Sequence, residues 1–152
     1  MHTNASNENK LMPFAVEAAW VTSRWEILTK FTTRIAGNVT QDFNLSIAVL
    51  FDALRKNQDN QNIQSTIREM RQSIASSMNT SSTASLQAAH EQLLRCHVLT
   101  DLEMIIDSQP QGEEERRKAM MILDNRLQVV GAYFNDKQYL LGIRRAAMEL
   151  MR

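Results

Sequence analysis

The sequence predicts an all-α protein in which antiparallel helical hairpins stack as an α-solenoid of about seven helices. Apolar residues recur every three or four positions along most of the 152 residues, which is the period of one helix face. Only four glycines and two prolines occur, too few for the many tight turns of a β-sandwich or barrel. Because the expected helices follow one another as pairs with exposed ends, we favour an open array over the alternative of a closed helical bundle.

Composition limits the functions that the chain can have. The 17 basic and 17 acidic residues give a formal net charge of zero, which argues against a basic surface for nucleic acid or an anionic membrane. A single cysteine excludes an internal disulfide and a multi-cysteine zinc site. The first ten residues lack the pattern of a secretory signal, and no apolar run is long enough to span a membrane. We therefore expect a soluble, intracellular helical protein without a cofactor.

The N-terminal end divides into an arm and a first helix. Residues 1–12 are polar and aperiodic, which predicts a disordered arm, and the helical-repeat segment is expected to span residues 13–152. Pro13 suits the first turn of a helix, because its missing N–H would be unpaired there. The apolar face expected for this helix consists of Phe14, Ala18 and Val21 and is widened by Ala15, Ala19 and Trp20.

A second helix is expected to begin at Trp25. Ser23 and Glu26 have the S-x-x-E spacing of a capping box, and Gly37 would end the helix. Four residues at helical spacing form its apolar stripe: Trp25, Leu28, Phe31 and Ile35. The first two helices together form a hairpin, the unit of a repeat array.

The third and fourth helices are expected on either side of the polar residues 56–62. Asp42 is a suitable N-cap for the third helix. Its apolar face carries Phe43, Ile47, Leu50, Phe51 and Leu54. The fourth helix has the clearest period, with Ile63, Ile67, Met70, Ile74 and Met78. The Ser/Thr-rich residues 79–82 are predicted to form a linker.

Three more helices follow. The fifth, from Leu86 to Ile106, is apolar over a wide arc, so we expect neighbours on two sides; a loop follows at residues 108–112. Three glutamates from Glu113 and three bases from Arg116 suit the start of a sixth helix, with pairs such as Glu114–Lys118. Its apolar side is Met120, Leu123, Leu127 and Val130, and Gly131 ends it. The last helix, capped by Asn135 or Asp136, carries Tyr139, Leu140, Ile143, Ala147 and Leu150.

Few residues suggest chemistry. His90 and His97 share a face of the fifth helix but lie about 10.5 Å apart along its axis, too far to bind one metal ion. Cys96 and His97 are adjacent and point about 100° apart, which disfavours a catalytic Cys–His pair. We interpret His97 as an interface histidine bonded to Asp101, four residues later. Phosphate-binding loops and kinase signatures are absent, so no catalytic, cofactor-binding or metal-binding residue is assigned.

Several segments occur in the order known from one family. Residues 16–20 and 25–28 contain E-A-A-W and W-E-I-L, residues 94–103 read L-R-C-H-V-L-T-D-L-E, and residues 126–127 and 139–145 read R-L and Y-L-L-G-I-R-R. These segments resemble the FAT domain of ATR-type checkpoint kinases, which are phosphatidylinositol-3-kinase-related kinases. The matching residues are Glu17, Ala18, Ala19, Trp20, Trp25, Leu28, His97, Leu99, Leu102, Glu103, Arg126, Leu127, Arg144 and Arg145.

The resemblance implies a role that the residues alone do not. In such kinases the FAT domain is an α-solenoid that clamps the kinase domain, contributes to dimerisation and helps transmit activation. The implied partners are other helical repeats and the kinase domain of the same parent, with a second protomer or an ATRIP-like subunit as further candidates. The implied parent is a nuclear Ser/Thr kinase of the DNA-damage response, whereas this chain by itself is not an enzyme. Thr40 and Ser108, each followed by glutamine in an expected loop, are hypothetical phosphorylation sites.

Two alternatives remain open at this point. One is a stand-alone tetratricopeptide-like adaptor that binds a peptide or a partner helix, which predicts polar or basic side chains along a concave groove. The other is a small enzyme that uses Cys96, His97 and Asp101. The scaffold hypothesis predicts instead unmatched apolar surface on the first and last helices.

Overall fold

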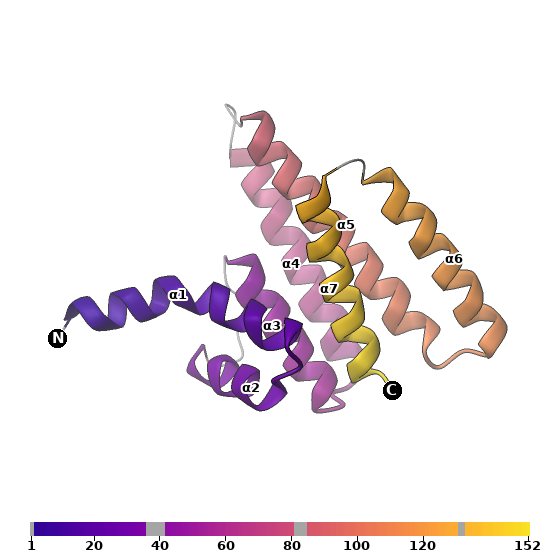
Figure 1. Cartoon of the computed structure of the whole chain (residues 1–152), viewed down its shortest axis with the longest axis horizontal. Coiled ribbons are helices and arrows are strands. Elements are labelled where there is room, and N and C mark those ends of the chain that lie inside the picture. Colours follow the sequence, from indigo (N-terminus) through magenta and orange to yellow (C-terminus); the bar gives the residue numbers. More distant parts are fainter. Residues whose placement is uncertain (1, 36–41, 81–84, 131–132) are drawn as a thin grey trace. The chain divides into compact units, whose positions relative to one another are not determined.

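The computed structural model describes residues 2–35, 42–80, 85–130 and 133–152, with the side chains of residues 2–6 and 80 excepted. These described residues form seven α-helices and no strand, packed as stacked hairpins, which confirms the all-α prediction (Figure 1). The helices are α1 His2–Val21, α2 Trp25–Arg34, α3 Phe43–Arg55, α4 Asn60–Thr80, α5 Leu86–Ser108, α6 Glu113–Val129 and α7 Phe134–Leu150.

The chain divides into two compact units, Met1–Ser73 and Ile74–Arg152, and the boundary falls inside α4. In the first unit, α1, α2 and α3 contact one another. In the second unit, α5 packs against both α6 and α7, which confirms the expectation of neighbours on two sides. Figure 1 shows α5 and α6 running in opposite directions, as the predicted hairpin requires.

An aromatic cluster forms the core of the first unit. The ring of Phe51 on α3 makes edge-to-face contacts with Trp20 at 5.6 Å and with Trp25 at 6.0 Å between centroids. Edge-to-face pairs of this kind add to the stabilisation that burial of the rings provides. The residues predicted for the apolar face of α3 are all buried: Phe43, Ile47, Leu50, Phe51 and Leu54.

The first helix differs from the prediction in two ways. It begins at His2, so the expected start of the helix after Pro13 is wrong, whereas the disorder expected for residues 1–12 stays a prediction. Pro13 removes only one backbone donor, and the adjacent Met12 is buried, so packing supports a helix that continues through the proline. The predicted centre of the apolar face is also wrong, because Phe14, Ala18 and Val21 are exposed. The buried face carries Ala19 and Trp20 from the predicted margin, together with Met12 and Val16. The start of the repeat segment at residue 13 stays a prediction.

The connection between α1 and α2 replaces the expected capping box. Ser23 has a φ of 57°, the left-handed conformation typical of the residue that ends a helix. The N–H of Arg24 donates to the carbonyl of Ala19 at 2.8 Å, which closes α1. Arg24 is therefore the N-cap of α2, without a side-chain hydrogen bond, although the predicted start at Trp25 is confirmed. Gly37, the expected stop, lies outside the described residues, and α2 ends at Arg34.

The caps and core of α3, α4 and α5 follow the sequence pattern closely. The Asp42 carboxylate accepts a hydrogen bond from the N–H of Leu45 at 3.0 Å, as expected for the N-cap of α3. On α4, Met78 is exposed, whereas the four other predicted positions are buried: Ile63, Ile67, Met70 and Ile74. The helix continues through Thr80, so the first half of the predicted linker is wrong, and Ser81 and Ser82 lie outside the described residues. Ser85 caps α5.

The last two helices depart from the prediction in their surface residues. On α6, Lys118 pairs with Glu115 at 3.0 Å rather than with Glu114. Leu123 is the buried residue of its predicted apolar side, whereas Met120 is exposed. The N-cap of α7 is Tyr133 rather than Asn135 or Asp136, and the predicted positions Leu140, Ile143 and Ala147 are buried.

One of the two hypothetical phosphorylation sites, Ser108, lies in a helix rather than in the expected loop. Ser108 is the last residue of α5, and its hydroxyl donates to the carbonyl of Ile105 at 3.0 Å. Thr40 lies outside the described residues.

Candidate functional site

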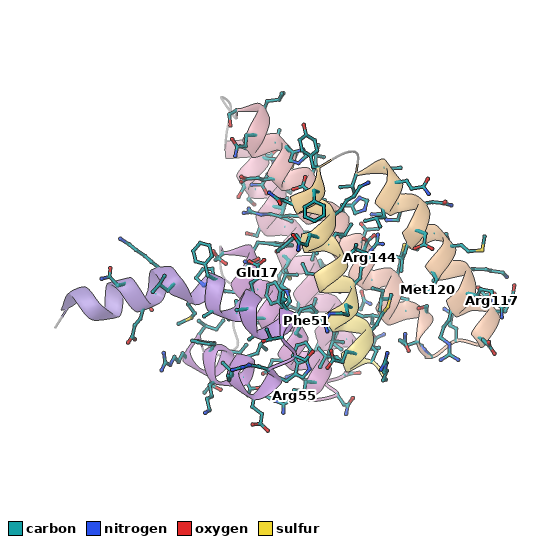
Figure 2. The ribbon with its side chains drawn as sticks, viewed as in Figure 1. Glu17, Phe51, Arg55, Arg117, Met120 and Arg144 are labelled. Atoms are coloured by element: carbon teal, nitrogen blue, oxygen red, sulfur yellow. The ribbon has the colours of Figure 1, made fainter. Side chains whose placement is uncertain are left out.

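A buried carboxylate connects the three helices of the second unit. Asp101 on α5 is fully buried and accepts hydrogen bonds from arginines on both neighbouring helices. Arg126 of α6 donates from Nε to Oδ1 at 2.7 Å. Arg144 of α7 donates from Nε and Nη2 to Oδ2, at 2.9 and 2.7 Å. We call Asp101, Arg126 and Arg144 the Asp101 cluster; Figure 2 labels Arg144 on α7.

The local sequence places these charges in the interior. Asp101 lies between the buried residues Leu99 and Leu102, so the apolar stripe of α5 carries it inward. Arg144 follows the buried Ile143 on α7, and its side chain is only 5% exposed. A charge in such a position is unfavourable unless it is paired and hydrogen-bonded, which these short, charge-assisted bonds achieve. The cluster therefore fixes how α6 and α7 are aligned on α5.

The charges of the cluster do not cancel. Two guanidinium groups share one carboxylate, and among the described residues Asp101 is the only acid paired with either arginine. Arg126 is 28% exposed, so solvent reaches its charge more than it reaches Arg144. Nη1 of Arg144 has no hydrogen-bond partner in the described part of the chain. The cluster thus carries one excess positive charge, with a donor of Arg144 available.

His97 lies beside the cluster without a hydrogen bond from its buried nitrogen. Its Nε2 is 3.7 Å from Oδ2 of Asp101, too far for a hydrogen bond, so the predicted bond is wrong although the predicted contact exists. The backbone carbonyl of His97 accepts from Nη2 of Arg126 at 3.4 Å. Burial lowers the pKa of His97; Asp101 opposes this effect, and the two arginines add to it. His97 is therefore neutral at pH 7 and acts as a packing residue.

The carboxylate of this arrangement is buried and already paired. Asp101 is inaccessible to a substrate and holds both arginines, and Cys96 beside His97 is a half-buried free thiol. The described residues contain no group of three or more His, Cys, Asp or Glu side chains that could hold a metal ion. Within the same residues, no helix is long and apolar enough to cross a membrane. What the cluster can do is hold three helices in one register.

The N-terminal motif residues have a structural arrangement of their own. Nδ2 of Asn44 on α3 donates to Oε2 of Glu17 at 3.3 Å and to the carbonyl of Pro13 at 3.4 Å, which ties α3 to α1. Ala19, Trp20 and Leu28 are buried, and Ala18 is exposed. Figure 2 labels Glu17 and Phe51 in this unit.

The remaining motif residues lie on the three helices of the second unit. Leu99 and Leu102 are buried, whereas Glu103 and Leu127 are half-buried. Arg145 is exposed and pairs with Glu149 one turn later at 3.3 Å. The structure therefore brings His97, Arg126 and Arg144 together and leaves Arg145 at the surface.

Sequence reasoning missed several polar contacts between helices, two of which involve the buried carboxylates of Asp101 and Asp52. It linked His97 to Asp101 but not Asp101 to the arginines; the available signal was an acid and a base at interior positions of two apolar stripes. It also missed Asp52 on α3, which accepts from the hydroxyl of Thr29 at 2.8 Å and pairs with Lys56 at 2.7 Å.

A comparison with protein families gives a match that covers nearly the whole chain. The family model described as the FAT domain matches residues 12–151. The chain belongs to the FAT domain family. FAT domains are helical regions of phosphatidylinositol-3-kinase-related kinases, and the FAT match covers both the Trp20–Phe51 core and the Asp101 cluster. No curated protein and no solved structure shows significant similarity to this FAT chain.

Proposed function

We propose that this FAT chain is a non-catalytic scaffold segment of an ATR-type checkpoint Ser/Thr kinase, supporting the kinase domain and protein contacts in the nuclear DNA-damage response. Membership of the FAT family supports the kinase context, because FAT domains pack against the kinase domain of their parent. The collinear motifs at residues 16–20, 25–28 and 94–103 favour the ATR type within that family.

The observation that carries the scaffold role is apolar surface on the first and last helices. Phe14 on α1 is 69% exposed, and Leu11 one turn earlier is also exposed. On α7, Phe134 is 73% exposed and Leu141 is partly exposed. Exposed apolar side chains on the first and last helices of a repeat array are typical of surfaces that another repeat or domain covers. Exposed apolar residues also occur on α5 and α6, so the surface available to partners is not confined to the two ends. This surface favours the scaffold over a stand-alone adaptor, whose terminal helices would have polar outer faces.

In this role the chain transmits a displacement between its contact surfaces and does not itself catalyse a reaction. The Asp101 cluster keeps α5, α6 and α7 aligned, so a displacement at one outer helix moves the unit as a body. Phosphorylation of Ser/Thr-Gln sites would then be carried out by the kinase domain of the parent, in the nucleus. A second protomer or an ATRIP-like subunit would be the further partner.

Binding of the purified chain to the isolated kinase-domain region of an ATR-type kinase tests this proposal. Phe14→Asp and Phe134→Asp place a charge in the outer apolar surface and should weaken binding about tenfold or more. Val129→Asp is the control, because Val129 is even more exposed than Phe14 and Phe134 but lies on α6. A kinase-domain region from another branch of the family should bind more weakly. Equal affinity for both regions, or equal affinity of all three variants, would overturn the proposal.

A further inference from the structure

An apolar groove lies between α6 and α7 in the second unit. Its volume is roughly 520 Å³, which lies within the range of ordinary ligand-binding clefts. Four apolar residues line it: Met120, Leu123, Leu141 and Met148. Met120 and Leu141 are partly exposed, and Figure 2 labels Met120 on α6. Methionine side chains adapt to irregular partners, so this groove suits packing against the apolar stripe of a helix.

The groove also reaches the excess charge of the Asp101 cluster. Arg144 lines the groove, and its Nη1 has no partner among the described residues. The other charges of the lining are equal in number, because Arg145 pairs with Glu149, and Asp124 and Arg152 contribute one charge of each sign. The uncompensated charge in the groove is therefore that of the cluster itself. A second carboxylate, supplied by a ligand at Arg144, would balance the charges of the two guanidinium groups.

We propose that the α6–α7 groove binds an amphipathic helix of a partner protein, which presents apolar side chains to Met120 and Leu141 and one Asp or Glu carboxylate to Arg144. The apolar contacts supply the driving force, and the charge-assisted bond at the largely buried Arg144 supplies specificity. The proposal depends on the groove and the cluster alone, so it stands whether or not the parent kinase is of the ATR type.

Synthetic helices provide the test with the whole 152-residue chain. One peptide of about 16 residues carries leucines at i, i+3, i+4 and i+7 and one glutamate on the same face; a second has glutamine in place of that glutamate. The glutamate peptide should bind with a Kd about tenfold lower than the glutamine peptide. Protein-detected NMR should place its contacts on α6 and α7.

Matched variants distinguish binding in the groove from nonspecific hydrophobic binding elsewhere on the surface. Met120→Gln combined with Leu141→Gln should weaken binding of the glutamate peptide about tenfold. Met121→Gln is the control, because Met121 is the next residue on α6, is more exposed than Met120 and does not line the groove. Circular dichroism should show that each variant retains its helices.

Three results would overturn the proposal. The first is equal affinity for the two peptides, which would mean that Arg144 does not select a carboxylate. The second is equal loss of binding in the groove variant and in Met121→Gln. The third is concentration-dependent self-association of the chain in sedimentation velocity that the groove variant abolishes and Met121→Gln does not, which would assign the groove to a second copy.

Discussion

Replacing Asp101 by asparagine should destabilise the second unit strongly. The substitution keeps the shape of the side chain but removes the charge that accepts three hydrogen bonds of 2.7 to 2.9 Å from two arginines. Breaking a buried ion pair by removing one partner costs about 3–5 kcal/mol, because the other charge stays buried without compensation. We expect the free energy of unfolding to fall by this amount.

A neighbouring arginine provides the control for this prediction. Arg144→Met leaves Asp101 with Arg126 alone and should cost about 3 kcal/mol. Arg145→Met alters the next residue, whose ion pair with Glu149 is exposed, and should cost no more than about 1 kcal/mol. Replacing the whole cluster, with leucine at 101 and methionine at 126 and 144, should recover most of the lost stability, because no buried charge remains.

Urea unfolding followed by far-UV circular dichroism measures these differences. Tryptophan fluorescence is a second readout, because both tryptophans, Trp20 and Trp25, lie in the first unit. Asp101→Asn should therefore shift the circular dichroism transition more than the fluorescence transition. A loss below about 1 kcal/mol for Asp101→Asn, or an equal loss in the fully apolar variant, would refute the reasoning.

Three further predictions concern single residues. Asp42→Ala removes the N-cap of α3 and should lower the free energy of unfolding by about 1 kcal/mol, measured in urea against Asp42→Asn, which retains a capping oxygen. Phe51→Ala should cost about 3–5 kcal/mol in the same assay and change the tryptophan emission, whereas Phe51→Leu should cost less; equal costs would contradict the aromatic contacts. Burial lowers the pKa of His97 below its ordinary value of 6.5, so the unfolded chain binds more protons as the pH falls from 6.5 toward the folded pKa. The free energy of unfolding should therefore decrease as the pH falls through that window. The unfolding midpoint of His97→Gln should depend less on pH.

The helices were predictable because their signals are local. The apolar period of α4 and the Asp42 cap depend on residues within a few positions of one another, and apart from the exposed Met78 both agree with the structure. The centre of the apolar face of α1 cannot be located in this way, because the exposed Phe14, Ala18 and Val21 and the buried Val16, Ala19 and Trp20 all lie at spacings that a helix face allows. Only contacts with distant residues such as Phe51 decide which of these faces is buried.

The contacts of the Asp101 cluster could not be predicted either, because they also join residues far apart in the sequence. Arg126 and Arg144 lie 25 and 43 positions after Asp101 in the sequence, so no spacing rule joins them. His97 and Asp101 were linked because they are one helical turn apart, but the distance between them depends on how the two arginines hold the carboxylate. Charged residues inside otherwise apolar stripes therefore indicate that a partner exists without identifying it.

The size and activity of the native polypeptide test the central claim most directly. An antibody raised against this chain should detect a polypeptide far larger than 17.4 kDa in the cells that express it. The immunoprecipitate should phosphorylate a Ser-Gln peptide but not the matching Ala-Gln peptide. A 17.4 kDa species alone, without Ser/Thr-Gln kinase activity in the precipitate, would contradict the assignment to an ATR-type kinase.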